Sequence, residues 1–156
     1  MKKMPRVNKV ITFRVKGSGL IPLQFVRDLP DGNLFIAEAI RSIPFEIKRV
    51  CYINNLANRK AVRGKHAHRL LEQVLVCVTG SFVLRLDDGF TRQRITLNDP
   101  SYGIRLGPML WHTMSLFSHD CGILVLASDW YDEADYIRDY AEFLKMAAVG
   151  TNRSLR

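Results

Sequence analysis

The strongest fold signal lies in residues 72–89, which read EQVLVCVTGSFVLRLDDG. Two short apolar runs, Val74–Val78 and Phe82–Leu86, are separated by a glycine-containing turn, and this length and punctuation are typical of β-strands. The second run and Arg92–Leu97 beyond it show the alternation expected of paired strands. The Asp88-Gly89 pair between these two runs is a favoured β-hairpin turn. This part of the chain therefore predicts consecutive antiparallel strands.

The same rhythm extends along the rest of the chain. Apolar or β-branched runs recur between turn signals at Leu34–Ala39, Ile47–Ile53, Tyr102–Leu106, Thr113–Phe117 and Gly122–Ser128. A long series of short strands favours an antiparallel sandwich or barrel. We therefore predict an all-β fold.

One segment near the C-terminus departs from the strand pattern. Asp132 can cap a helix that has Glu133 and Asp135 in its first turn. Apolar and aromatic side chains then recur at helical spacing, at Tyr136, Ile137, Tyr140, Phe143 and Leu144. We predict an amphipathic C-terminal α-helix that packs against the barrel.

Length and composition limit the class of protein. A chain of 156 residues is long enough for one domain with a sizeable core. We divide it into a basic N-terminal extension (1–18), a single domain (19–148) and a C-terminal tail (149–156). The three cysteines are odd in number and lie in apolar contexts, so we interpret them as core residues rather than disulfide partners. No leader pattern or window of roughly 18 apolar residues is present, so we expect a cytoplasmic protein without membrane contact.

The basic charge is concentrated in a few places. The formal net charge is +8, but six of the basic side chains lie at residues 2–9 and 153–156. Residues 47–71 contain seven Lys and Arg and no Asp or Glu. Such a segment suits a diphosphate, which arginine binds through bidentate, charge-assisted hydrogen bonds, although a solvated basic face is the plainer alternative. Extended nucleic-acid binding is disfavoured, because it needs a broader basic surface with exposed aromatic rings.

A His-x-His pair, His66 and His68, lies inside this basic segment. In a strand the two side chains share one face, with Cβ atoms roughly 6.5 to 7 Å apart. They can be structural histidines, or they can straddle a sugar ring, or they can hold a metal together with His112, as in metal-binding cupin barrels. The carboxylate ligand expected in that case falls on Gln73, with Glu72 on the opposite side of the strand. An uncharged amide is a poor metal ligand, so we favour acid–base use of the histidines and predict no metal and no cofactor.

Together these motifs resemble one enzyme family. The similar segments are Arg63–His68, Glu72–Cys77, Leu86–Gly89, Gly107-Pro108 with Trp111-His112, and Leu126–Ser128 with Tyr131–Glu133 and Asp135–Arg138. From about residue 20 to 144 the chain resembles the dTDP-4-keto-6-deoxyglucose 3,4-ketoisomerases, which are WxcM-like members of the cupin superfamily. The resemblance implies a double-stranded β-helix, or jelly-roll, barrel and a homodimer with no metal requirement. It also implies a dTDP-linked 4-keto-6-deoxy sugar as the substrate, converted to the 3-keto sugar in deoxysugar biosynthesis.

The resemblance also implies roles for particular residues. Proton transfer falls on His66 and His68, and a further active-site role falls on Tyr52. Moving a ketone from C4 to C3 removes the C3 proton, passes through an enediol and returns a proton to C4, which suits two histidines on one face. Which of them is the acid and which the base stays open. Substrate contacts are expected from Arg49, Arg63, Lys65, Gln73, Trp111 and His112, with the arginines on the diphosphate.

One position departs from the family pattern. An Arg-Gly pair is usual near the start of the family core, with the arginine reaching the active site, whereas this chain has Asp31-Gly32. Either Arg27 or another basic group substitutes, or the substrate differs, or the activity is altered. Asp31 also suits a plain surface turn.

Three other functions compete with the ketoisomerase. A dTDP-sugar 3,5-epimerase on the same barrel would rely on one histidine as base. A metal-dependent cupin enzyme would contain stoichiometric metal. A non-catalytic sugar-nucleotide-binding protein would bind the ligand and leave it unchanged.

Overall fold

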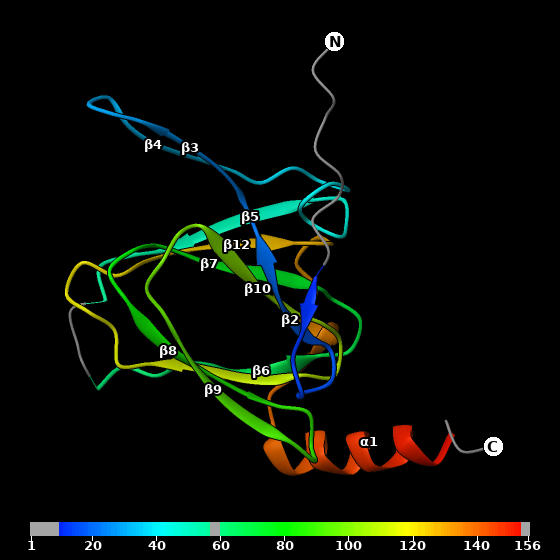
Figure 1. The fold of residues 1–156 in the computed structure, drawn as a ribbon. Coiled ribbons are helices and arrows are strands. Elements are labelled where there is room, and N and C mark those ends of the chain that lie inside the picture. Colours follow the sequence, from blue (N-terminus) through cyan, green and yellow to red (C-terminus); the bar gives the residue numbers. More distant parts are fainter. Residues whose placement is uncertain (1–9, 57–59, 154–156) are drawn as a thin grey trace.

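The computed structural model describes residues 10–56 and 60–153, with side chains up to residue 150. Two antiparallel sheets face each other and form a barrel (Figure 1). In spatial order the first sheet contains β1 (Ile11–Thr12), β2 (Ser18–Pro22), β10 (Tyr102–Leu106), β7 (Gln73–Thr79), β12 (Gly122–Ala127) and β5 (Arg49–Ile53). The second contains β13 (Tyr136–Ile137), β6 (Arg63–His68), β11 (Trp111–Ser115), β8 (Phe82–Asp87) and β9 (Arg92–Leu97). The predicted all-β jelly-roll barrel is confirmed.

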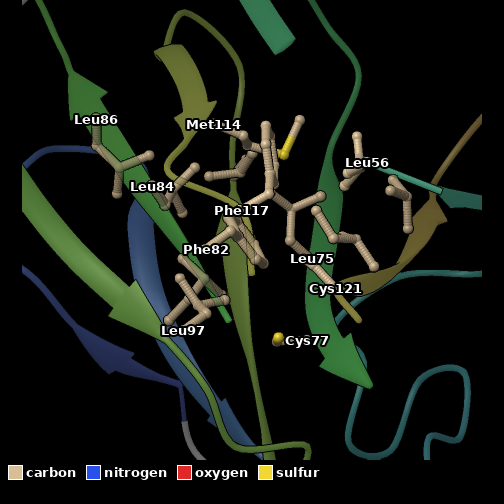
Figure 2. Close-up of a cluster of buried hydrophobic side chains, with 14 of the residues drawn as sticks. Leu56, Leu75, Cys77, Phe82, Leu84, Leu86, Leu97, Met114, Phe117 and Cys121 are labelled. Carbon is tan, nitrogen blue, oxygen red and sulfur yellow. The ribbon is translucent and has the colours of Figure 1, made fainter. Parts of the chain in front are cut away.

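The core fills the space between the two sheets. Leu75 of β7 faces Phe82 and Leu84 of β8 there, and all three side chains are buried (Figure 2). Phe117, just beyond β11, stacks on Phe82 with ring centroids 6.2 Å apart. These inward positions are the apolar half of the alternation seen in the sequence, so burial of one face of each strand holds the barrel together.

The cysteines divide between core and surface. Cys77 and Cys121 are free thiols buried in this core, and burial raises the pKa of the Cys77 thiol to about 12. The prediction that all three cysteines are core residues is wrong for Cys51, which is exposed. Cys51 lies on β5, the last strand of its sheet, where it lines an open cavity rather than the packed core.

The C-terminal helix begins later than predicted. Asp132 caps only a single 3₁₀ turn, η1 (Glu133–Asp135), by accepting a hydrogen bond from the Ala134 amide. The next two residues form β13, which pairs with β6. Helix α1 (Tyr140–Arg153) then starts behind Asp139, whose carboxylate accepts from the Glu142 amide at 2.7 Å. Backbone pairing with the edge of β6 is what delays the helix.

Helix α1 covers the outer face of β6, as the apolar stripe predicted. Phe143 is fully buried and packs with Ala67 of β6 and Ile137 of β13. Figure 1 shows α1 beneath the second sheet. No helix in the described ranges is long and apolar enough to cross a membrane.

Packing extends beyond the expected domain limits of 19 and 148. On the N-terminal side, β1 pairs with β2, and Val15 between them is fully buried in the core. On the C-terminal side, α1 continues to Arg153. Half of the expected extension, residues 1–9, lies outside the described residues.

A hairpin of β3 (Gln24–Asp28) and β4 (Gly32–Ile36) projects from the barrel (Figure 1). Phe25 and Phe35 stack on each other across it, with ring centroids 4.9 Å apart. Asp31 lies in its turn, beside Gly32, which has a left-handed φ of 117°. Asp31 and Arg27 therefore both lie on the projecting hairpin.

Candidate active site

A cavity of about 430 Å³ opens inside the barrel, with β5, β6 and β11 along its walls. We call it the histidine cavity. Six of the predicted site residues line it: Arg49, Tyr52, Arg63, His66, Gln73 and His112. His68 is buried directly beside His66. Lys65 and Trp111 are not brought to this cavity.

Four ring side chains form a continuous row at the base of the cavity. His66 is directly opposite His112 of β11, and His68 is directly opposite Tyr136 of β13, so each pair shares a sheet face. The His66 ring centroid lies 4.9 Å from His68 and 4.5 Å from His112. The Tyr136 ring lies 4.9 Å from His66 and 4.3 Å from His68. The predicted common face of His66 and His68 is confirmed.

A β-bulge brings His66 close to His112. The register between β6 and β11 shifts at this point, so that Gly64 is opposite Thr113 while Lys65 has no partner there. Gly64 has a φ of 80°, and a Cβ placed on it would lie 2.8 Å from the His112 carbonyl oxygen. Glycine is therefore required for the close approach of the two strands. Lys65, at a φ of 57°, is exposed, which explains why it does not line the cavity.

The environment of His66 favours a neutral ring with a free acceptor nitrogen. Its Nδ1 lies 3.0 Å from the Gly64 carbonyl oxygen, which can only accept, so Nδ1 is the protonated nitrogen and donates. When the ring is neutral, Nε2 then holds the lone pair. Desolvation by burial lowers the pKa of His66, and the positive charge of Arg138 lowers it further. Near neutral pH this ring can accept a proton.

His68 is oriented by a carboxylate. Its Nδ1 donates to Asp135 at 3.0 Å, and the Asp135 carboxylate also accepts from the backbone amides of Leu70 and Leu71, at 2.8 and 3.2 Å. The opposite ring nitrogen, Nε2, is buried and has no hydrogen-bond partner among the described residues. Burial lowers the pKa of His68 to about 4, with a contribution from His66, against the opposing effect of Asp135.

His112 is the most deeply buried of the three histidines at the cavity. Burial lowers its pKa to about 3, with smaller contributions from His66 and His68. All three rings are thus neutral at pH 7. Among the three, only His68 contacts a carboxylate in the described structure, that of Asp135. His68 is therefore the histidine best equipped to stabilise a transient positive charge.

Two arginines lie at the mouth of the cavity, where they suit an anion. Arg49 lies beside the Tyr131 ring, 5.8 Å from its centroid, and its buried Nε has no hydrogen-bond partner among the described residues. Arg63 is exposed at the rim. Gln73 is buried in the wall, whereas Glu72 points to the other face of β7 and pairs with Arg105, as the alternation predicted. Arg49 is therefore the cation best placed for a phosphate group.

Tyr52 lies at the rim, with 75% of its surface exposed. Side chains alternate along β5, so Arg49 and Tyr52, three residues apart, cannot share a face, and Cys51 takes the inward position. The tyrosine that contacts both histidines is Tyr136, which the sequence analysis assigned to the helix. Arg49 and Tyr52 are an odd number of positions apart, and this spacing in the sequence already indicates that they lie on opposite faces of β5.

A network of charged and aromatic groups supports Tyr136. The Arg138 guanidinium lies 4.3 Å from the centroid of the Tyr136 ring. It also makes two hydrogen bonds with Glu133, at 2.7 and 2.9 Å, and Glu133 in turn accepts from the Tyr131 hydroxyl. This network fixes the ring wall of the cavity on the β13 side. Among the described residues, no grouping of His, Cys, Asp and Glu is arranged to hold a metal ion.

The barrel that holds this row of neutral histidines is of the cupin type, and comparisons with known proteins agree. The fold is shared with a 4-keto-6-deoxy sugar epimerase from Streptomyces spheroides, at a TM-score of 0.69 and 19% identity, covering 87% of this chain and 76% of that one. A family model described as WxcM-like, C-terminal matches residues 16–148. The chain therefore belongs to the WxcM-like family.

Closer relatives narrow the class. The chain is 52% identical over 117 residues to a TDP-4-oxo-6-deoxy-alpha-D-glucose-3,4-oxoisomerase from Aneurinibacillus thermoaerophilus, covering 75% of this chain and 84% of that protein. It is 41% identical to a sugar 3,4-ketoisomerase from Thermoanaerobacterium thermosaccharolyticum solved with TDP, at a TM-score of 0.82, covering 85% of this chain and 96% of that one. This chain is accordingly an isomerase of the 3,4-ketoisomerase type.

Proposed function

We propose that this protein converts dTDP-4-keto-6-deoxy-D-glucose into a dTDP-3-keto-6-deoxyhexose for deoxysugar biosynthesis. The observation that carries the proposal is the pair of neutral histidines, His66 and His68, on one face of a cavity that also contains Arg49. Solved relatives were crystallised with TDP and with TDP-4-keto-6-deoxyglucose, which supports the same ligand class here.

The reaction needs only proton movements. A base takes the proton from C3, the C3–C4 double bond forms, and the C4 oxygen takes up a proton to give the enediol. The C3 hydroxyl then loses its proton to become the ketone while C4 gains one, so no electrons leave the sugar. His66 lines the cavity with its Nε2 lone pair available, and we assign the removal of the C3 proton to it.

His68 and its neighbours support this step. A proton on either ring of the His66–His68 pair is stabilised by the Asp135 carboxylate behind His68. We assign the return of a proton to C4 to this pair. Tyr136 contacts both rings, so its hydroxyl is the better placed donor to the enediolate oxygen, and Tyr52 stays a candidate at the rim. Arg49 and Arg63 would bind the diphosphate.

We propose that the chemistry is independent of metal. Prolonged treatment with a chelator, followed by elemental analysis, should leave turnover unchanged in protein with no stoichiometric metal. Loss of activity that returns with a divalent metal would instead support the metal-dependent cupin reading.

The decisive experiment is incubation with dTDP-4-keto-6-deoxyglucose in deuterium oxide, followed by NMR of the sugar. The expected result is a 3-keto product carrying deuterium at C4. Deuterium at C5 would indicate the epimerase. Binding of the substrate with no exchange at any carbon would indicate a binding protein.

We further propose that the protein is a homodimer. The projecting hairpin and the open β5 edge expose apolar side chains that a second copy would cover, including Phe25 (45% exposed), Leu34 (56%) and Val50 (59%). Light scattering should give a mass near twice the 17.9 kDa of one chain, and Leu34→Asp should shift it to one chain. A single-chain mass for the unaltered protein would contradict the dimer. The cytoplasmic location expected from the sequence stays a prediction.

A further inference from the structure

A second cavity, of about 560 Å³, lies on the outer face of the second sheet. Side chains alternate along β11, so His112 points into the barrel while Trp111 and Thr113 point out of it. The outer cavity is lined by Arg85, Arg94, Trp111, Thr113 and Tyr140, among others. We call it the outer groove. A single layer of strands separates it from the histidine cavity.

Two arginines face each other on the floor of the outer groove. Arg85 of β8 and Arg94 of β9 are directly opposite in the ladder, and both are exposed. Like charges at directly opposite positions destabilise a sheet, so such a pair needs a counter-charge. Arg85 donates to the Ser115 hydroxyl at 2.7 Å, a neutral partner. No carboxylate pairs with either arginine in the described part of the chain.

Asp87 is the one carboxylate among the described residues that line the groove, and its charge is already neutralised. Asp87 accepts hydrogen bonds from Arg92 at 2.8 Å, from the Tyr140 hydroxyl at 2.7 Å and from the Gly89 amide at 2.7 Å. Asp87 is buried at the rim nearest α1, and these bonds hold its carboxylate away from Arg85 and Arg94. The charge left open in the groove is therefore that of Arg85 and Arg94.

Aromatic rings form one wall of the groove. Trp111 is partly exposed and is held edge-on against Tyr140, with ring centroids 5.1 Å apart, and against Phe143 at 5.6 Å. Tyr140 is fixed in turn by its bonds to Asp87 and to Arg92, the latter at 2.9 Å. A rigid indole beside two guanidinium groups combines a stacking surface with a bidentate anion site. Nucleoside phosphates present a planar ring and an anion together.

We propose that the outer groove binds a nucleoside phosphate, with its phosphates on Arg85 and Arg94 and its base on Trp111. The site lies on the strands that carry His112 and the core of the barrel, yet shares no lining residue with the histidine cavity. The proposal is independent of the reaction assigned above, because it concerns binding outside the histidine cavity.

Intrinsic fluorescence gives a direct test. The chain has two tryptophans, so Trp130→Phe leaves Trp111 as the only reporter. The probe is ADP, whose purine offers a large stacking area. We expect saturable quenching of Trp111, and a dissociation constant raised at least about tenfold by Arg85→Gln or Arg94→Gln in the same background. Absence of quenching at millimolar ADP would overturn the proposal.

Two controls separate the outer groove from other sites. Arg14→Gln removes an exposed arginine elsewhere, and Arg49→Gln removes the cation of the histidine cavity; both should leave the ADP signal unchanged. Quenching that depends on Arg49 and not on Arg94 would place the ligand in the histidine cavity and contradict the proposal. Arg94→Gln should keep normal turnover of the sugar nucleotide, so failure of the two proposals is distinguishable.

Inorganic pyrophosphate tests the two halves of the site separately. It should displace ADP while causing little quenching itself, because it has no ring to stack on Trp111. Failure to displace ADP would overturn the phosphate contacts. Binding as tight as that of ADP would overturn the stacking on Trp111.

Discussion

The two faces of the second sheet show how burial decides what a basic side chain can do. On the inner face, burial holds the pKa of His112 near 3 and that of the adjacent His68 near 4, so the rings are neutral with lone pairs available. On the outer face, the guanidinium groups of Arg85 and Arg94 are exposed. A neutral imidazole can take a proton, whereas a guanidinium can only donate hydrogen bonds to an anion. One layer of strands thus separates proton-transfer groups from an anion-binding pair.

The largest expected effect is on the inner face. His66→Asn and His68→Asn should each lower turnover at least about 100-fold, because an amide cannot take up and return the sugar proton. Binding of dTDP, measured by calorimetry, should change little, because the diphosphate contacts fall on arginines. His119→Asn alters an exposed histidine and is the matched control. Near-normal turnover in both cavity variants would contradict the assignment of proton transfer to His66 and His68.

Asp135→Asn tests whether the carboxylate is what distinguishes His68 from its neighbours. Loss of a charge-assisted hydrogen bond should lower kcat about 10- to 100-fold with little change in KM. Removing the negative charge also lowers the pKa of His68, so the acidic limb of the pH–rate profile should move to lower pH. Asp132→Asn alters the cap of the same turn without touching His68. An unchanged pH profile in Asp135→Asn would reduce Asp135 to a structural role.

The neutral inner face also predicts acid sensitivity of the fold. The folded pKa values of His68 and His112 lie below the unfolded value, so the unfolded chain binds more protons between about pH 6.5 and 4. The contribution of these neutral histidines to the free energy of unfolding should therefore be fully present above about pH 6.5. It should fall as pH drops, by about 2 kcal/mol per histidine between pH 7 and 5. Urea unfolding at the two pH values measures this. His68→Asn should flatten the dependence and His119→Asn should not; equal slopes in all three proteins would contradict it.

The smallest expected effect compares two tyrosines. Tyr136→Phe should lower kcat about 2- to 10-fold, because it removes one neutral hydrogen bond to the enediolate oxygen. Tyr52→Phe should have a smaller effect, because Tyr52 lies at the rim with most of its surface exposed. Steady-state kinetics on both variants decides the ranking. A larger loss of kcat in Tyr52→Phe than in Tyr136→Phe would indicate that Tyr52 supplies the hydroxyl that donates to the enediolate oxygen.

Local patterns were sufficient for the barrel and for part of the site. The alternation in β6 and β7 correctly placed His66 with His68 and separated Gln73 from Glu72, since a strand has a period of two. The same period of two puts Tyr52 and Arg49 on opposite faces of β5. Lys65 lies outside the histidine cavity for a different reason, because a β-bulge at positive φ breaks the alternation and is not visible in the sequence.

Long-range pairings account for what the sequence analysis missed. Asp135 and Tyr136 lie in a stretch with good helix signals, yet two residues of backbone pairing with β6 convert it into a strand beside the histidines. Trp111, for which a substrate contact is a prediction, lines the outer groove, because its neighbour His112 takes the inward position on β11. The facing of Arg85 and Arg94 likewise depends on the register of the β8–β9 hairpin.

By itself the sequence determined the strand rhythm, the single core and the shared face of the two histidines, because the backbone geometry of a strand imposes its alternation locally. Only the tertiary structure decided which nitrogens are free and which are held. The carboxylate on His68 comes from 67 residues away, and the desolvation that keeps the rings neutral comes from the surrounding strands. Proton affinity depends on burial and neighbours, and both exist only after the two sheets have closed.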